Sequence, residues 1–327
     1  MKILVTGGGG FLGKAIVKRL LERGDRVRSF SRGDYPELCD LGAEVRSGDL
    51  VDKSAVLAAV EGCGAVFHVA AKPGIWGDYS LYFAANARGT RNVIEACLKT
   101  RVSKLVYTSS PSVVFGGGSM EGVNESVPYP ESYLAHYPKT KAMAERDVLA
   151  ANSTSLATVA LRPHLIWGPG DPNFLPRLIE RRKSGRLARV GKNPHLVDCI
   201  YIDNAVDAHL LALEKLHPKS PVSGKPYFIS QGEPIDIGDL MDRILGAAGL
   251  DPIDRAVSEK FAYGAGWLLE LIYGTLQLKQ EPPMTRFLAK QLSTAHWFDI
   301  SAARKDLGYT PGISISEGLE RLAESLK

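Results

Sequence analysis

The stretch that decides the fold is Lys2-Ile-Leu-Val-Thr-Gly-Gly-Gly-Gly-Phe-Leu-Gly-Lys14. Its apolar, partly β-branched run from Ile3 to Val5 is typical of a strand buried on both faces. Four glycines follow Thr6, and a helical pattern of apolar residues begins at Phe11. A strand, a glycine turn and a helix N-terminus present free N–H groups and the positive end of a helix dipole to an anion, and a pyrophosphate fits both.

Two nucleotide motifs fit this turn. Gly8, Gly10 and Gly13 match G-x-G-x-x-G, and starting from Gly7 gives the wider G-x-x-G-x-x-G spacing, so the turn is predicted to bind a dinucleotide. The run from Gly8 also resembles a P-loop, but Ala15 follows it and has no hydroxyl for a magnesium ion. A glycine turn without a ligand is the remaining alternative. The expected cofactor contacts here are Thr6, Gly7, Gly10, Phe11, Leu12 and Gly13.

Length and composition bound the class of protein. A chain of 327 residues with 45% hydrophobic content predicts one large α/β domain with a smaller appendage. The net charge of +4 is too small to indicate a nucleic-acid partner. No signal-peptide pattern precedes the first strand, so a cytoplasmic location is expected. The four cysteines are far apart, and the histidines lack His-x-x-x-His spacing, so neither a disulfide framework nor a metal site is predicted.

A cluster of positive charge lies in the second half of the chain. Glu180 is the acidic residue that offsets it nearby, and no aromatic residues interleave it, so stacking on nucleic acid has no support. The charges form either a solvated helix face or a landing site for an anionic substrate or an acidic partner. The members are Arg177, Arg181, Arg182, Lys183, Arg186, Arg189 and Lys192.

The second predicted strand, residues 26–30, indicates which dinucleotide binds. Folds that prefer NAD place an acid near the end of this strand to accept from the ribose 2′-OH. Here Ser31 and Arg32 follow instead, and a guanidinium suits the 2′-phosphate of NADP. The sequence therefore favours NADP, while Asp34 keeps NAD open.

Strands and helices alternate from this point on. Further strands are predicted over 43–46, 65–69, 102–107 and 156–161, with a long helix over 79–100. The alternation predicts an α/β fold with a Rossmann-type, doubly wound parallel sheet that binds ligands at the carboxyl ends of its strands. Asp49 is expected either to contact the cofactor or to cap the following helix. The other contacts expected at these strand ends are Leu50, Ala70, Ala71 and Lys72.

The motif with catalytic chemistry is Tyr137-Pro-Lys-Thr-Lys141. Pro138 is tolerated only in the first turn of a helix, so Tyr137 should lie at a helix start, with Lys141 on the same face at i+4. A phenol exchanges protons poorly at neutral pH, and a neighbouring ammonium together with an oxidised nicotinamide would lower its pKa. Ser110, at the end of the fifth strand, could hold a carbonyl while Tyr137 protonates it. This chemistry is carbonyl reduction or its reverse.

Taken together, these motifs resemble the extended short-chain dehydrogenases/reductases. Within that superfamily the chain resembles the 3β-hydroxysteroid and sterol-4-carboxylate dehydrogenase branch, and there it is especially similar to the bacterial 2-alkyl-3-oxoalkanoate reductases of olefin biosynthesis. Val113-Val-Phe-Gly116 replaces the Val-Tyr-Gly usual in nucleotide-sugar epimerases, which disfavours a sugar-nucleotide substrate. The matching motifs are Thr6-Gly-x-x-Gly-x-x-Gly13, Asp49-Leu50, Asn86-x-x-Gly-Thr90, Thr108-Ser-Ser110, Tyr137-x-x-x-Lys141, Leu161-Arg-Pro163, Trp167-Gly-Pro169 and Tyr201-Ile-Asp-Asn204.

The resemblance implies roles for individual residues. Ser110, Tyr137 and Lys141 would form the catalytic triad, and Lys141 would also hold the nicotinamide ribose. Asn86 would lie at the cofactor site and mainly brace neighbouring strands. The resemblance also implies a homodimer. The remaining expected contacts are Pro163 and His164 for the cofactor, and Ser112 and Trp76 for the substrate.

The second half of the chain is expected to supply the substrate domain. We predict an NADP-binding domain over 1–165 and about 195–217, and a smaller substrate-binding domain over about 166–194 and 218–327. Residues 261–278 are apolar around nearly their whole circumference yet barely long enough to span a bilayer. They are interpreted as a core helix, as a lid over a long alkyl chain, or as a peripheral membrane or dimer contact.

The leading functional hypothesis is an NADP-dependent reductase that converts the ketone of a long-chain 2-alkyl-3-oxoalkanoate to the 3-hydroxy acid. One alternative is a sterol 3β-hydroxy (4-carboxylate) dehydrogenase. A second alternative is a non-catalytic NADP-binding regulator, which would need neither Tyr137 nor Lys141.

Overall fold

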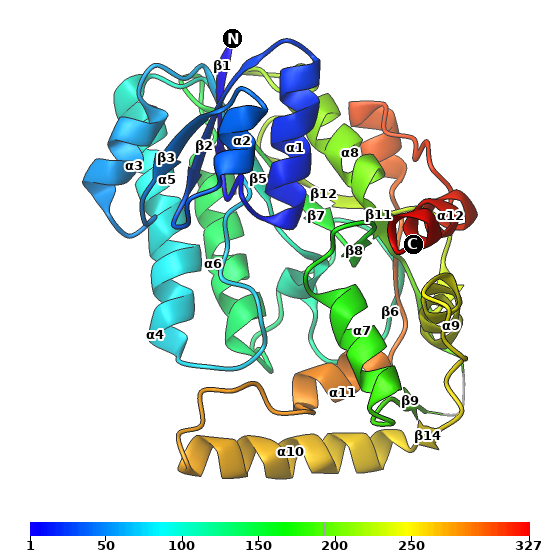
Figure 1. Cartoon of the computed structure of the whole chain (residues 1–327). Helices are drawn as coiled ribbons and strands as arrows, with labels where there is room; N and C mark the ends of the chain where they lie inside the picture. Colours follow the sequence, from blue (N-terminus) through cyan, green and yellow to red (C-terminus); the bar gives the residue numbers. More distant parts are fainter. Residues whose placement is uncertain (192–193) are drawn as a thin grey trace.

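The centre of the molecule is a parallel sheet of seven strands, seen in a computed structural model that describes residues 1–191 and 194–327 (Figure 1). Lys192, a member of the expected basic cluster, lies outside the described residues. The predicted Rossmann-type, doubly wound α/β sheet is confirmed. In spatial order the strands are β12 (Lys225–Ile229), β7 (Ala157–Pro163), β5 (Lys104–Thr108), β4 (Ala65–His68), β1 (Lys2–Thr6), β2 (Arg26–Ser31) and β3 (Glu44–Ser47).

The central strands are apolar because helices cover both faces of the sheet (Figure 1). Every residue of β4 and of β7 is buried. The strand order reverses at β1, since the chain builds β2 and β3 on one side and then crosses to β4 on the other. The carboxyl ends of β1 and β4 are therefore the expected ligand site. The flanking helices are α1 (Phe11–Glu22) and α8 (Ile202–Lys215) on one face, and α3 (Lys53–Val60), α5 (Gly89–Thr100) and α6 (His136–Ala150) on the other.

The long helix predicted over 79–100 is interrupted by a π-helical segment. It consists of α4 (Tyr79–Tyr82), the π segment Phe83–Arg88 and α5. Single turns of π-helix are frequent at functional sites. This one contains Asn86, whose side chain bonds outside the helix.

A group of short strands and helices lies beyond the carboxyl ends of the parallel strands and beside them, at the lower and right sides of Figure 1. It includes a four-stranded sheet of order β13-β10-β15-β6. The elements of this region are β6 (Met120–Val123), β8 (Ile166–Trp167), α7 (Phe174–Lys183), β9 (Arg189–Val190), β10 (Leu196–Val197), β11 (Ile200–Tyr201), β13 (Ile235–Asp236), α9 (Ile237–Ala247), β14 (Ala256–Val257), α10 (Glu259–Thr275), α11 (Arg286–Leu292), β15 (His296–Phe298) and α12 (Ile315–Ser325).

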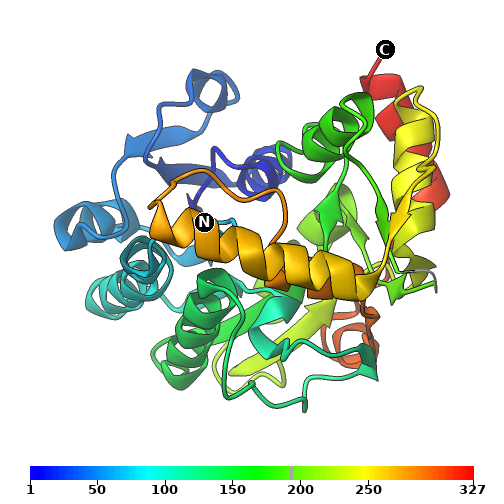
Figure 2. The same cartoon turned by 90° about the horizontal axis from the view of Figure 1, so that it is seen from below.

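Helix α10 crosses the lower side of the molecule as its outermost element (Figure 2). Only Ala262 and Gly266 of this helix are buried. The interpretation of residues 261–278 as a core helix is therefore wrong, because apolar side chains around the whole circumference did not indicate which side would be covered. No helix within the described ranges is both long and apolar enough to cross a bilayer.

Candidate active site

The glycine turn forms a tight cradle between β1 and α1. Gly7 has a φ of +72°, and the Gly10 N–H donates to the Gly7 carbonyl over 2.9 Å. A Cβ at position 13 would lie 2.1 Å from that carbonyl oxygen, so only glycine lets the helix pack this closely. Gly10 caps α1 without a side chain, and the first turn contains no acid. The first N–H groups of α1 are therefore available to an anion.

A buried polar chain fixes the strand ends around this cradle. Thr6 Oγ1 accepts from the Ala70 N–H over 3.2 Å and lies 2.7 Å from His68 Nδ1. The other ring nitrogen of His68 lies 2.9 Å from Thr90 Oγ1. Burial lowers the pKa of His68 to about 3, so the imidazole is neutral and works as a structural link. Sequence reasoning missed His68, although it lies two residues before Ala70, the first of the small residues assigned to the cofactor.

The end of β2 presents the residues predicted to select the cofactor. Ser31 Oγ accepts from the Gly9 N–H over 3.2 Å, and the Arg32 side chain is exposed just beyond the strand. Asp49 accepts from the Val51 N–H and Leu50 is buried. The expectation that Asp49 caps the next helix is wrong.

The helix cap belongs instead to Asp52. Its carboxylate accepts from the N–H groups of Ser54 and Ala55 at the start of α3. The two acids are only three positions apart, and the sequence did not distinguish them.

Asn86 joins the loop after β4 to helix α6. Its Oδ1 accepts from the Lys72 N–H over 2.7 Å, and its Nδ2 donates to Thr140 Oγ1 over 3.0 Å. The Lys72 ammonium lies 5.0 Å from the centre of the Tyr82 ring. These bonds hold a loop and a helix rather than the neighbouring strands that the resemblance implies, and a direct contact of Asn86 with a cofactor stays a prediction.

Tyr137 is the second residue of α6, as Pro138 predicted. The phenol lies near the Ser110 hydroxyl, and Ser110 Oγ lies 2.9 Å from Ser112 Oγ. The Tyr137 side chain is partly exposed, yet the protein packed around it raises the pKa of the phenol to about 12, and the nearby Ser110 hydroxyl opposes this. The structure thus brings together a hydroxyl pair and a phenol that still carries its proton at neutral pH.

Lys141 lies one turn farther along α6 and is buried. Its Nζ donates to the Thr108 carbonyl over 2.6 Å and lies 4.1 Å from the centre of the Tyr107 ring. Burial lowers the pKa of this ammonium to about 7, against the charge of Glu145. We expected Lys141 and an oxidised nicotinamide together to lower the pKa of Tyr137. In the protein without cofactor this pKa is raised instead, because burial of the phenol is the largest effect.

Glu145 extends the same helix face by one more turn, and sequence reasoning missed it. Its carboxylate accepts from Arg162 Nη2 over 2.7 Å and Nε over 3.0 Å, and the Tyr129 hydroxyl donates to it over 2.6 Å. The Arg162 and Glu145 side chains are 2% and 0% exposed. The available signal was the i, i+4 spacing from Lys141 and the position of Arg162 within the Leu-Arg-Pro motif.

Three further predicted residues lie on loops and strand ends near this face. Pro163 ends β7. Burial lowers the pKa of His164 to about 4, and its ring lies 5.3 Å from that of Phe298. Trp76 donates its indole N–H to the Leu278 carbonyl over 3.1 Å, so the structure ties it to the end of the α10 segment. Contact of Trp76 with a substrate stays a prediction.

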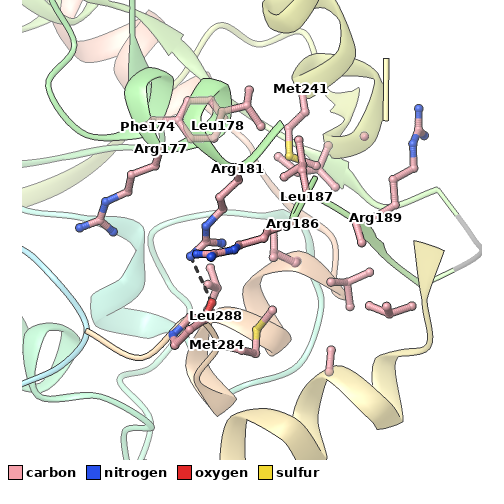
Figure 3. A pocket seen from close by; sticks show the side chains of 18 of the residues that line it. Phe174, Arg177, Leu178, Arg181, Arg186, Leu187, Arg189, Met241, Met284 and Leu288 are labelled. Atoms are coloured by element: carbon pink, nitrogen blue, oxygen red, sulfur yellow. Dashed lines mark hydrogen bonds between the residues drawn. The ribbon is translucent and has the colours of Figure 1, made fainter. Parts of the chain in front are cut away.

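A cavity of about 1130 Å³ lies among the elements beyond the sheet, and its lining does not include Ser110, Tyr137 or Lys141 (Figure 3). Gly74 and Ile75, on the loop that also carries Lys72, form part of its wall. The remaining wall is largely apolar and comes from α7, α9, α10, α11 and the segments that precede β9 and α11, with labelled members Phe174, Leu178, Leu187, Met241, Met284 and Leu288.

Four arginines of the basic cluster also line this cavity, and acids neutralise two of them. Arg177 pairs with Glu281, and Arg189 pairs with acids of α9. Arg181 donates to the Pro283 carbonyl, and its guanidinium points toward that of Arg186 (Figure 3). Neither Arg181 nor Arg186 has an acidic partner in the part of the chain that the structure describes. The cavity therefore combines apolar walls with two uncompensated positive charges.

The geometry at the end of β1 fits a dinucleotide. The closed cradle of Gly7 and Gly13 leaves no room for side chains where a pyrophosphate would lie, and the helix end beside it lacks a competing acid. Arg32 directly follows β2 and its side chain is exposed, and its contact with a 2′-phosphate stays a prediction.

Known proteins that are similar to this chain over nearly its whole length are named as reductases or dehydrogenases. A 2-alkyl-3-oxoalkanoate reductase of Stenotrophomonas maltophilia is 53% identical over 99% of both chains. A protein of the same name from Shewanella oneidensis is 50% identical over 98% of this chain and 85% of its own. A sterol-4-alpha-carboxylate 3-dehydrogenase, decarboxylating, of Mus musculus is 34% identical over 99% of this chain and 90% of its own.

The fold is shared with solved structures as well. MoeE5, in complex with UDP-glucose and NAD, superimposes with a TM-score of 0.77 at 25% identity, over 99% of this chain and 98% of its own. The family model described as 3-beta hydroxysteroid dehydrogenase/isomerase matches residues 4–257. The chain belongs to the 3-beta hydroxysteroid dehydrogenase/isomerase family.

Proposed function

We propose that this protein is an NADP-dependent oxidoreductase that reduces the ketone of a long-chain 2-alkyl-3-oxoalkanoate to the 3-hydroxy acid. The observation that carries the proposal is the large, mostly apolar cavity between α7, α9, α10 and α11, in a chain half identical to reductases of that name. Its volume exceeds the roughly 300–1,000 Å³ usual for small-molecule sites, as two alkyl chains require. Arg181 or Arg186 is available to the substrate carboxylate.

The residues of the site divide the reaction between them. Ser110, oriented by Ser112, donates a hydrogen bond to the carbonyl oxygen, and Tyr137 gives its proton to the same oxygen as negative charge develops there. NADPH, when bound, supplies the hydride that the carbonyl carbon accepts. Lys141 follows Tyr137 by one turn of α6, and its amine, where protonated, is proposed to stabilise the phenolate that the proton transfer leaves behind. The product therefore gains one hydride on carbon and one proton on oxygen.

Turnover of a synthetic substrate tests the proposal. NADPH oxidation, followed by nicotinamide absorbance, is expected with 2-alkyl-3-oxoalkanoates that carry two long chains, and kcat/KM is expected to fall as the chains shorten, since each buried methylene contributes about 0.8 kcal/mol. Absence of turnover at every chain length would exclude this function.

Two alternatives are separated by the same assay. The relative from Mus musculus named as a sterol dehydrogenase makes a 3β-hydroxysterol the second candidate substrate. Reduction of NADP⁺ or NAD⁺ with such a sterol, but no turnover of the oxoacids, would favour it. A non-catalytic NADP-binding regulator would bind cofactor and turn over neither compound; the buried Lys141 beside Tyr137 speaks against it.

Cofactor preference depends on Arg32. Replacing Arg32 by Ala removes the proposed charge-assisted bond to the 2′-phosphate, so the Kd of NADPH is expected to rise roughly 10- to 100-fold, from about 1.5–3 kcal/mol per such bond. The Kd of NADH should change little, because NADH lacks that phosphate. Fluorescence titration measures both constants.

A matched control for Arg32 lies on the next strand. Arg46 is also an exposed arginine, and it pairs with Glu44. Arg46→Ala should leave both dissociation constants unchanged. An equal loss of NADPH and NADH affinity in Arg32→Ala would contradict the assignment to NADP.

We further propose a cytoplasmic homodimer in which residues 1–165 and about 195–217 bind the cofactor and the remainder binds the long-chain substrate. The exposed apolar segment 261–278 is the surface proposed for peripheral membrane contact. A mass of 35.4 kDa by light scattering, the mass of one chain, would exclude the dimer.

A further inference from the structure

We infer that the outer face of α10 and the turn after it dock onto an anionic bilayer surface, and that the cavity behind this helix exchanges its substrate with the lipid. The docking follows from exposed side chains and charges of residues 259–281. The exchange of substrate rests in addition on the proposed function.

The outer face of α10 is an apolar stripe turned to solvent, and Figure 2 shows no element in front of it. The one charged side chain between residues 261 and 278 is Glu270, which faces inward and accepts from the backbone and the guanidinium of Arg286. A helix on a protein surface normally turns its apolar side to the core, so this reversed arrangement indicates an apolar neighbour. The exposed fractions are 66% for Phe261, 53% for Trp267, 49% for Leu268, 50% for Leu271, 39% for Ile272 and 64% for Leu276.

The charges around the stripe are arranged for an anionic surface. The three acids of residues 259–281 each lie against a basic neighbour. Lys260 and Lys279 stand at the two ends of the stripe, and neither has an acidic partner among residues 1–191 and 194–327. An apolar stripe with tryptophan and phenylalanine, flanked by free lysines, is the pattern of helices that lie in the headgroup region of anionic membranes. The acid contacts are Glu259 with His195, Glu270 with Arg286, and Glu281 with Arg177.

The opposite side of the same helix faces the cavity. Ala262 and Ala265 line it, and Phe261 belongs both to the wall and to the stripe. A substrate with two long alkyl chains resides in lipid, because each methylene favours apolar surroundings over water by roughly fourfold. Docking through α10 therefore places the cavity wall directly against the phase that holds the substrate.

Vesicle binding tests the inference. The cofactor-loaded full chain is mixed with vesicles of phosphatidylglycerol or of phosphatidylcholine, and sedimentation together with tryptophan fluorescence gives the partition constant. We expect binding to phosphatidylglycerol with a blue shift from Trp267. Leu268→Glu combined with Leu271→Glu should lower the partition constant roughly 100-fold. Each substitution replaces an apolar contact by a negative charge and is expected to contribute about tenfold.

Two further variants serve as the charge test and the control. Lys260→Gln with Lys279→Gln should reduce the preference for phosphatidylglycerol roughly fivefold per lysine and leave the binding to phosphatidylcholine unchanged. Leu41→Glu with Leu326→Glu replaces leucines that are 45% and 47% exposed outside the stripe, and this variant should bind like the wild type. Circular dichroism verifies that each variant is folded.

The outcomes separate the possible occupants of this face. Wild-type protein that stays in solution with both vesicle types overturns the inference. A second result also overturns the inference: the wild type forms an oligomer and does not bind vesicles, and the Leu268→Glu, Leu271→Glu variant loses that oligomer. The face would then be a contact between two copies of this chain. Vesicle binding without any oxoacid turnover in detergent would support the docking and reject the proposed function, so the two failures are distinguishable.

Discussion

Replacing Tyr137 by Phe is expected to lower kcat/KM for ketone reduction roughly 1,000-fold, within the 10²–10⁴ that a positioned general acid contributes. The change removes one hydroxyl and leaves the ring, so α6 and the cofactor cradle keep their packing. The Kd of NADPH, measured by fluorescence titration, should therefore stay within about twofold of the wild-type value, whereas the loss of about 1.4 kcal/mol of binding free energy would raise it tenfold.

The size of this effect follows from where the proton is held. Burial raises the pKa of the Tyr137 phenol to about 12, so the group carries its proton at neutral pH and can donate it to the carbonyl oxygen. Ser110 can hold the carbonyl oxygen, but a serine hydroxyl is a much weaker acid. Without Tyr137 the developing alkoxide must take its proton from water.

The matched control is Tyr79→Phe. Tyr79 lies on α4, and its ring packs against His136, the residue beside Tyr137, at 5.4 Å between ring centres. Its hydroxyl makes only a long contact of 3.9 Å with the Met143 sulfur. We expect activity within about twofold of wild type, since a weak contact of this kind contributes little. Retention of more than a tenth of the activity by Tyr137→Phe would contradict the assigned proton donor.

The parts of the site that the sequence predicted are those formed by neighbours in the chain. The glycine turn and the Tyr137–Lys141 pair each lie within a dozen residues, and their geometry follows from local rules for turns and for i, i+4 spacing. The strand β12 was missed because it contains Pro226, which fits an edge strand but weakens a strand pattern.

Long-range contacts explain the other omissions. Glu145 was missed because its partner Arg162 comes from the following strand and not from its own helix. The exposure of α10 is a second case. A run of apolar residues gives no indication of which side the rest of the chain will cover, and only the inward position of Glu270 against Arg286 shows the orientation.

Replacing Glu145 by Gln is expected to lower the free energy of unfolding by about 3–5 kcal/mol, the usual consequence of removing one partner of a buried ion pair. Arg162 would stay charged and buried without a counter-ion, because its guanidinium holds its proton at any accessible pH. Chemical denaturation of the cofactor-free protein, monitored by circular dichroism, measures the change. Glu95→Gln is the control, since Glu95 forms an exposed pair with Lys53, and exposed pairs contribute about 0–1 kcal/mol.

The same substitution should also affect the active site, since Glu145 lies one helical turn from Lys141. The charge of Glu145 opposes the burial that lowers the pKa of Lys141 to about 7, so its removal lowers that pKa further and leaves the amine neutral at pH 7. Glu145→Leu combined with Arg162→Leu should recover most of the stability, because it removes both charges together. If this double variant recovers its stability but keeps a low kcat, Glu145 acts on Lys141 through its charge. If the double variant recovers both stability and kcat, the role of Glu145 is structural only.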